Sequence, residues 1–376
     1  MKVYFDNAAT TAIDAEVVDA MLPYLREHFG NPSSQYSIGR DTRAAIEEAR
    51  KTIAQLINAQ ANEIIFTSCA TEANNMAIKG AVNDLGVRRI ITSPIEHHCV
   101  ENTIEYCKDK LEIEVVFVDI DDKGNVDLSH LDSLLQASDK KTLVSLMHAN
   151  NEIGTLLDVE KVGALCKQYQ AFFHSDTVQS FAHLPIDVQK MNIDFLVASA
   201  HKFHGPKGIG FLYMRKQNKV HPILHGGGQE RGYRAGTENV YGIVGMAFAA
   251  QKAYQHLEED KQYILGIKNY FLEQLQTNFP GIEINGNTDD RSLFTVLNVS
   301  FPPNDKSALL LFMLDMEGVC CSGGSACSSG ASVGSHVIHA LKKDENRVSI
   351  RFSFSKYNTK EEVDFAIEKL RKVIGY

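Results

Sequence analysis

The chain contains 376 residues, and its 44% hydrophobic and 23% charged residues are the proportions of an ordinary soluble globular protein. A net charge of −9 argues against nucleic acid or an anionic membrane as the main partner, because phosphate groups bind to basic surfaces. No apolar run has signal-peptide or membrane-spanning length, and the seven cysteines are an odd number, which favours a cytoplasmic protein with reduced thiols.

Up to about Thr237, helix-like segments alternate with short apolar runs rich in β-branched residues. The predicted helices are residues 14–27, 42–56, 72–81 and 158–169. The predicted strands are residues 64–67, 90–92, 115–118, 143–147, 172–175, 195–198 and 209–214. This alternation is typical of an α/β fold with a mainly parallel sheet, and we expect it to form a large domain over residues 13–255.

The pattern changes in the last third of the chain. The predicted elements there are a long helix over 241–277, a strand over 295–301, a helix over 306–316, a strand over 348–354 and a helix over 360–373. We expect these elements, joined by the N-terminal residues 1–12, to form a smaller α+β domain over 256–376.

Two charged residues follow neighbouring predicted strands. Lys202 ends the run Ser-Ala-His-Lys, 199–202, just after the strand 195–198, and Asp176 follows the strand 172–175. Carboxyl ends of strands are where α/β folds bind ligands, and pyridoxal 5'-phosphate (PLP) requires a lysine for attachment and a carboxylate for its pyridine nitrogen. Each residue alone has an ordinary explanation, a solvated lysine or a helix cap, but the pair predicts a PLP site.

Two further turns fit the same cofactor. Residues 68–72 join a strand to a helix, so free backbone N–H groups there could bind a phosphate, although Thr71 could equally be a simple capping residue. His97 follows another strand and could stack on a cofactor ring or form a structural hydrogen bond, and its neighbour His98 could do the same.

The loop 321–330 is rich in serine and glycine and contains Cys327. A thiol among such small residues is a candidate nucleophile. Cys320 and Cys321 could join it in a metal or redox site, but no fourth ligand has the spacing of a zinc site, so we predict no metal. The glycines 226–228 and 232 lack the spacing of a dinucleotide-binding loop, which argues against a dehydrogenase.

Taken in order, these motifs resemble those of the cysteine desulfurases, PLP enzymes of fold type I, the fold of aspartate aminotransferase. The resemblance spans nearly the whole chain. Its motif blocks are residues 4–11, 29–34, 66–68, 71–75, 96–98, 148–154, 176–180, 201–202, 205–208, 231–232, 236–237, the Cys327 loop and 350–353. One departure is Cys69, which stands where the family more often has glycine.

The resemblance implies a role for each site residue. Lys202 would hold PLP covalently and move the α-proton of the substrate, with Asp176 at the pyridine nitrogen, His97 stacked on the ring and Gln179 at its phenolic oxygen. Asn151 and Arg351 would bind the substrate carboxylate. The phosphate would be bound by Ala70, Thr71, Ser199 and His201, and by Thr237 of the partner subunit, so the site implies a homodimer.

The resemblance also implies the reaction. L-cysteine would become L-alanine, with a persulfide formed on Cys327, and Lys202, Cys327 and His97 would be the catalytic residues. The sulfur would then pass to an acceptor protein or a scaffold for iron–sulfur cluster assembly. The alternative within the same class is a selenocysteine lyase or another PLP-dependent cysteine lyase.

Overall fold

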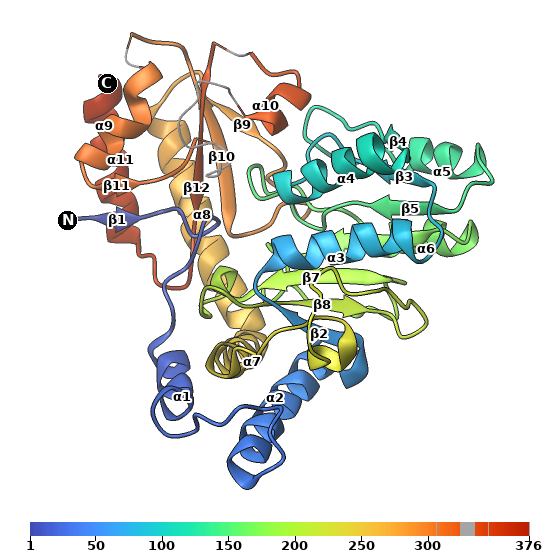
Figure 1. The fold of residues 1–376 in the computed structure, drawn as a ribbon. Coiled ribbons are helices and arrows are strands. Elements are labelled where there is room, and N and C mark those ends of the chain that lie inside the picture. The colour runs from blue at the N-terminus through green and yellow to red at the C-terminus, as the bar shows by residue number, and fades with distance from the viewer. Residues whose placement is uncertain (306, 324–334, 345, 376) are drawn as a thin grey trace.

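A seven-stranded sheet organises the first two thirds of the chain in the computed structural model, which describes residues 1–305, 307–323, 335–344 and 346–375 (Figure 1). In spatial order its strands are β2 (Ile64–Thr67), β8 (Gly210–Met214), β7 (Phe195–Ser199), β6 (Phe172–Asp176), β5 (Thr142–Ser145), β3 (Arg89–Thr92) and β4 (Glu114–Phe117). The neighbouring pairs are parallel except those made by β8, which is antiparallel to β2 and β7. The prediction of a mainly parallel sheet is therefore confirmed.

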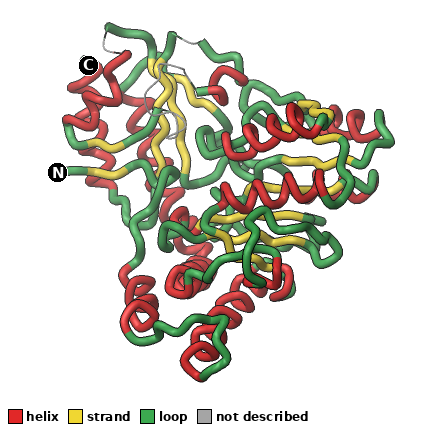
Figure 2. Tube along the Cα trace, viewed as in Figure 1, coloured by secondary structure: helices red, strands yellow, loops and turns green. Residues whose placement is uncertain are grey.

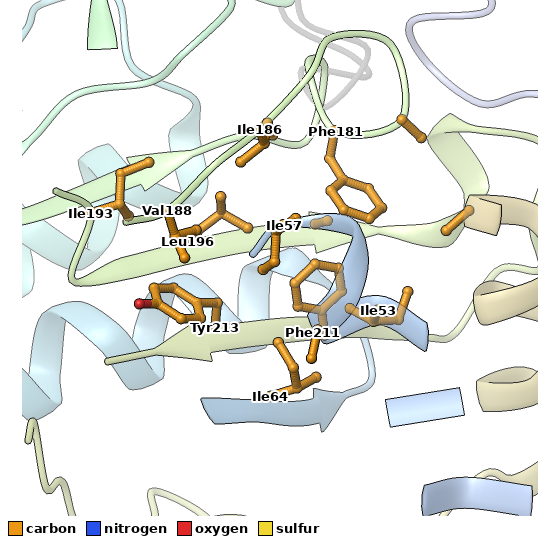
Figure 3. Close-up of a cluster of buried hydrophobic side chains, with 14 of the residues drawn as sticks. Ile53, Ile57, Ile64, Phe181, Ile186, Val188, Ile193, Leu196, Phe211 and Tyr213 are labelled. Atoms are coloured by element: carbon orange, nitrogen blue, oxygen red, sulfur yellow. The ribbon is translucent and has the colours of Figure 1, made fainter. Parts of the chain in front are cut away.

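Helices cover both faces of this sheet. They are α1 (Ala15–Arg26), α2 (Ser37–Leu56), α3 (Ala70–Asn83), α4 (His98–Leu111), α5 (Leu128–Gln136), α6 (Val159–Gln168) and α7 (Val240–Gln255). Successive strand residues point to opposite faces, so Ile65 packs with α3 and α4 while Ile64 packs on the α2 side. Figure 3 shows Ile64 and Phe211 against Ile53 of α2.

A second, antiparallel sheet lies in the C-terminal third. Its strands, in order, are β12 (Val348–Ser353), β10 (Val296–Phe301) and β9 (Glu283–Asn285). The helices of this region are α8 (Leu257–Asn278), α9 (Leu310–Met316), α10 (His336–Ala340) and α11 (Lys360–Ile374). None of the described helices combines the length and apolar character needed to cross a membrane.

The N-terminus packs against this C-terminal region, as Figures 1 and 2 show. Strand β1 (Val3–Tyr4) pairs in parallel with β11 (Val319–Cys320), and Phe5 is buried in the same hydrophobic cluster as α8 and α11. We keep the division into a large domain, 13–255, and a small domain, 1–12 with 256–376, as a proposal. The separate hydrophobic cluster of the C-terminal region supports it.

Several elements differ from the predictions. The predicted helix 241–277 is two helices, α7 and α8, which meet at His256, and α2 begins at Ser37 rather than at residue 42. The helices α4 and α5 were missed. In α4 the inward positions include Thr103 and Cys107, which obscure the apolar periodicity. The predicted helix 306–316 becomes a 3-10 turn, Ser307–Leu309, followed by α9, and residue 306 lies outside the described residues.

A buried ion pair links α2 to the 3-10 helix Gln229–Gly232. Both terminal nitrogens of Arg50 donate to the Glu230 carboxylate, at 2.6 and 2.8 Å, and the Phe66 N–H donates to it at 2.8 Å. Neither side chain is more than 2% exposed. Replacing Glu230 with alanine should lower the free energy of unfolding by about 3 kcal/mol, because the buried Arg50 loses its two short bonds to a carboxylate and keeps only the longer ion pair with Glu47, at 3.4 Å.

Urea unfolding followed by circular dichroism measures this effect. The matched control is Glu48→Ala, which removes an exposed carboxylate from α2 and should change the unfolding free energy little. Equal unfolding midpoints for the Glu230 and Glu48 variants would contradict the prediction.

Candidate active site

A cavity of about 240 Å³ opens at the carboxyl ends of β6 and β7. It is lined by Ala8, Ala9, Cys69, Ala70, Thr71, His97, Cys99, Met147, Asn151, Asp176, Val178, Gln179, Ser199, His201, Lys202 and Arg351. Of the predicted site residues, Thr237 is exposed and does not line the cavity, and Cys327 lies outside the described residues. The cavity therefore brings together residues that are far apart in the sequence.

Asp176 ends strand β6 and is 4% exposed. One carboxylate oxygen accepts a hydrogen bond from the Asn74 amide at 2.8 Å, and the other accepts from the Val178 N–H at 3.0 Å. Among the described residues, no cation pairs with this carboxylate. A buried charge without a counterion is costly, so Asp176 suits a cationic group of a ligand, such as the protonated pyridine nitrogen of PLP.

Lys202 ends the short 3-10 turn that follows β7. Its amine donates to the backbone carbonyls of Ala8 at 2.6 Å and Ala9 at 2.9 Å. The Gln179 amide also donates to the Ala8 carbonyl, at 3.0 Å. The N-terminal segment therefore holds the lysine amine in the cavity that contains the Asp176 carboxylate.

The first turn of α3 lines the cavity at Ala70 and Thr71. Its N-cap is Cys69, whose side chain makes no capping hydrogen bond, so Thr71 is not the cap that the alternative interpretation required. The Ala70 N–H donates to the Ser199 hydroxyl at 3.1 Å. The positive end of a helix dipole at the cavity favours an anion such as a phosphate, which supports the predicted phosphate site. Burial, with the charges of Lys202 and Lys207, lowers the pKa of His201 to about 4, so this ring is neutral.

Arg351 lies on β12 and is 1% exposed. Its terminal nitrogens donate to the Asn151 carbonyl at 2.9 Å and to the Asp6 carboxylate at 2.7 Å. Its Nε is buried and has no partner among the described residues. One terminal nitrogen of the guanidinium is already bonded to Asp6. The assignment of Arg351 to a substrate carboxylate therefore remains a proposal.

Both ends of the segment that contains Cys327 are tied to this region. Ser322 and Arg351 exchange two backbone hydrogen bonds, at 2.6 and 3.2 Å. After the segment, the Ser335 hydroxyl donates to Glu152, and the His336 Nε2 donates to the Glu96 carbonyl at 2.9 Å.

Sequence reasoning missed several cavity residues. They are Ala8, Ala9, Cys99, Met147 and Val178. Ala8, Ala9 and Val178 lie in the motif blocks 4–11 and 176–180, and Cys99 stands two residues after His97, but no role was assigned to any of them. Nothing in the composition of the N-terminal segment marks the Ala8 and Ala9 carbonyls as partners of a lysine almost two hundred residues away.

The buried carboxyl group of Glu96, next to His97, gives a pH prediction. Burial is the main reason that its pKa rises from 4.5 to about 8. Between these values the folded protein binds a proton that the unfolded chain has lost, so the contribution of Glu96 to stability falls as pH rises. The melting temperature of the parent should therefore fall relative to that of Glu96→Gln between pH 5 and 8.

Thermal unfolding at several pH values measures this difference. The control is Glu105→Gln, at an exposed glutamate nine residues further along the chain. Its melting temperature should depend on pH as that of the parent does. A difference in melting temperature between the parent and Glu96→Gln that stays constant from pH 5 to 8 would contradict the raised pKa of Glu96.

Comparison with known proteins gives the family. Residues 3–365 match the class-V aminotransferase family. The chain is 44% identical to proteins named cysteine desulfurase IscS from Dictyoglomus turgidum and Methanosarcina thermophila, over 99% of this chain and 94% and 92% of those proteins.

Solved structures agree with this match. A NifS-like protein, 38% identical, superimposes with a TM-score of 0.92 over the full length of both chains. A structure titled SspA in complex with cysteine, 33% identical, has a TM-score of 0.82 over 96% of this chain and 100% of that one. The chain therefore belongs to the class-V aminotransferases and, within them, to the cysteine desulfurases.

Proposed function

We propose that this chain is a PLP-dependent cysteine desulfurase, which converts L-cysteine to L-alanine and takes the sulfur as a persulfide on Cys327. The observation that carries the proposal is that one cavity contains both the Lys202 amine and the buried Asp176 carboxylate. Among the described residues, no ion pair is formed by this carboxylate. Class-V aminotransferases and cysteine desulfurases are PLP-dependent enzymes. The cysteine bound to the similar structure supports the substrate.

The residues of the cavity have distinct roles toward the cofactor. Lys202 would attach PLP, and Asp176 would keep its ring nitrogen protonated, with His97 on the ring face and Gln179 at the phenolic oxygen. The first turn of α3, at Ala70 and Thr71, would bind the phosphate together with Ser199 and His201. When bound, PLP withdraws electrons from the α-carbon of an attached amino acid.

The chain's own groups then perform the sulfur transfer. Asn151 and Arg351 would hold the substrate carboxylate, and the Lys202 amine would accept the α-proton and return a proton to the product. The Cys327 thiolate would attack the substrate sulfur, so that a sulfur–sulfur bond forms as the carbon–sulfur bond breaks. The carbon that loses sulfur is protonated, and L-alanine leaves.

We also propose a homodimer. Thr237 is exposed and outside the cavity of its own chain, which fits a contribution to the phosphate site of a partner. Exposed aromatic side chains support the same idea, since Phe29 is 79% and Tyr36 61% exposed. Sedimentation velocity should give twice the chain mass, and a monomer that still turns over cysteine would contradict the proposal.

Two further assignments concern the location of the protein and the fate of the sulfur. The six described cysteines are free, which supports a reducing, cytoplasmic location. The sulfur of the persulfide would pass to an acceptor protein or an iron–sulfur scaffold, as the relatives named cysteine desulfurase IscS suggest.

The central experiment combines three measurements on one preparation. The purified protein should show the visible absorption of lysine-bound PLP, and this absorption should change when L-cysteine is added. Alanine should accumulate with time. Mass spectrometry of the digested protein should then place one additional sulfur atom on the peptide that contains Cys327. Turnover without alanine, or sulfur on another cysteine alone, would refute the proposal.

A further inference from the structure

The Asn74 side chain joins two residues that line the cavity. One hydrogen of its amide nitrogen is donated to the Asp176 carboxylate at 2.8 Å and the other to the Cys99 sulfur at 3.1 Å. A carboxylate only accepts hydrogen bonds, so the amide nitrogen must face Asp176, and the amide oxygen faces the Nε2 of His174 at 2.9 Å. The orientation of Asn74 is therefore fixed by its partners.

His174 supports this orientation from behind. Because its Nε2 meets the amide oxygen of Asn74, that nitrogen is the donor, and its Nδ1 accepts from the Ser145 hydroxyl at 2.9 Å. Burial lowers the pKa of His174 to about 4, so the ring is neutral and has one proton to donate. Asn74, which is fully buried, is thus bonded at its oxygen and through both hydrogens.

The proton position on His97 follows from the other end of the network. His97 is the N-cap of α4, and its Nδ1 accepts the Cys99 N–H at 3.2 Å. A backbone N–H can only donate, so Nδ1 carries the lone pair, and the neutral ring carries its proton on Nε2. The Cys99 sulfur lies 3.0 Å from the same Nδ1 and must therefore donate its S–H. Burial raises the pKa of this thiol, which keeps the proton in place.

We propose that Asn74 and Cys99 are positioning residues, which hold the proton of His97 on Nε2 and link that ring to the Asp176 carboxylate. His97 then offers an N–H donor to the bound substrate at neutral pH, because its Nδ1 is already occupied. The consequence for catalysis rests on the proposed function, but the hydrogen bonds belong to the chain itself. Neither residue was singled out for this role by the sequence.

The test reads the proton position directly. Holoprotein containing ¹⁵N-labelled histidine, without substrate, gives separate signals for ring nitrogens with and without a proton, and His97→Gln assigns the signals of His97. We expect the parent to show the proton on Nε2. The Cys99 N–H, 3.2 Å from Nδ1, remains in every variant, whereas the closer S–H donor at 3.0 Å is lost in Cys99→Ala and loses its support in Asn74→Ala. Each alanine variant should therefore shift both His97 nitrogens part of the way toward a mixture of the two forms, and Cys99→Ser, which keeps a side-chain donor, should restore the parent spectrum.

A second measurement tests the link to Asp176. Asn74→Ala removes one of the two hydrogen bonds to that carboxylate, so PLP should dissociate about tenfold more readily, as expected for a hydrogen bond to a charged group. The matched controls are Asn75→Ala, the next residue of α3, and Cys107→Ala, a buried thiol on α4; both should leave the His97 signals and the PLP affinity unchanged.

The outcomes separate this inference from the proposed function. A His97 spectrum that is unchanged in either alanine variant, or that Cys99→Ser fails to restore, would overturn the positioning role. So would a parent ring that carries its proton on Nδ1. Failure of the parent to form alanine from L-cysteine, with these spectra as expected, would instead overturn the proposed reaction. If Asn74→Ala does not fold, the comparison of Cys99→Ala with Cys99→Ser still tests the positioning role.

Discussion

Replacing Cys327 with alanine should stop sulfur transfer while leaving the cofactor chemistry in place. Lys202, Asp176, His97 and the first turn of α3 are unchanged by this substitution, so PLP should bind and its visible absorption should still change when L-cysteine is added. Alanine formation should fall by at least about a hundredfold, because hydroxyls and water are poor nucleophiles toward sulfur.

The neighbouring thiols are the matched controls for this variant. Burial raises the pKa of Cys321, so it stays a neutral thiol and cannot replace a thiolate at Cys327. Cys320→Ala with Cys321→Ala should therefore form the persulfide on Cys327 and release alanine as the parent does. Alanine release by Cys327→Ala at the parent rate would show that the lyase reaction needs no protein thiol.

The site residues that could be predicted are charged residues near the carboxyl end of a strand. Asp176 and Lys202 come at or shortly after the ends of two short strands that begin with apolar residues, and parallel strands bring their carboxyl ends to one edge of the sheet. Spacing along the chain was therefore enough to place two charged groups in one cavity. The strands around them were predicted to within a few residues for the same reason, since buried parallel strands are short and continuously apolar.

The positions that could not be predicted depend on contacts between distant segments. The Ala8 carbonyl accepts a hydrogen bond from Lys202 because the N-terminal segment lies at the edge of the large sheet. No local sequence pattern predicts where that segment packs. Asn74 had a weak signal, a polar side chain between the buried Ala73 and Met76 of α3, but its partners come from two other elements. Helix α4 was missed because threonine and cysteine occupy its buried face.

Replacing Lys202 tests the covalent role of its amine, and two variants are needed. Lys202→Ala removes the amine together with its hydrogen bonds to the Ala8 and Ala9 carbonyls, so a loss of activity could reflect disturbed packing. Lys202→Arg keeps a cation that can donate to both carbonyls, but a guanidinium stays protonated and does not attach PLP. An exposed lysine after β8, in Lys219→Ala, is the control.

Both Lys202 variants should lose alanine formation by at least about a thousandfold, because the same amine attaches the cofactor and moves the α-proton. PLP should remain bound without the covalent bond, since Asp176 and the first turn of α3 still hold it, and its visible absorption should be that of the free aldehyde. Loss of activity in Lys202→Ala alone would reveal a packing role. Alanine formation by Lys202→Arg at near the parent rate would remove Lys202 from the chemistry, because the arginine preserves the charge and the hydrogen bonds and lacks only the reactive amine.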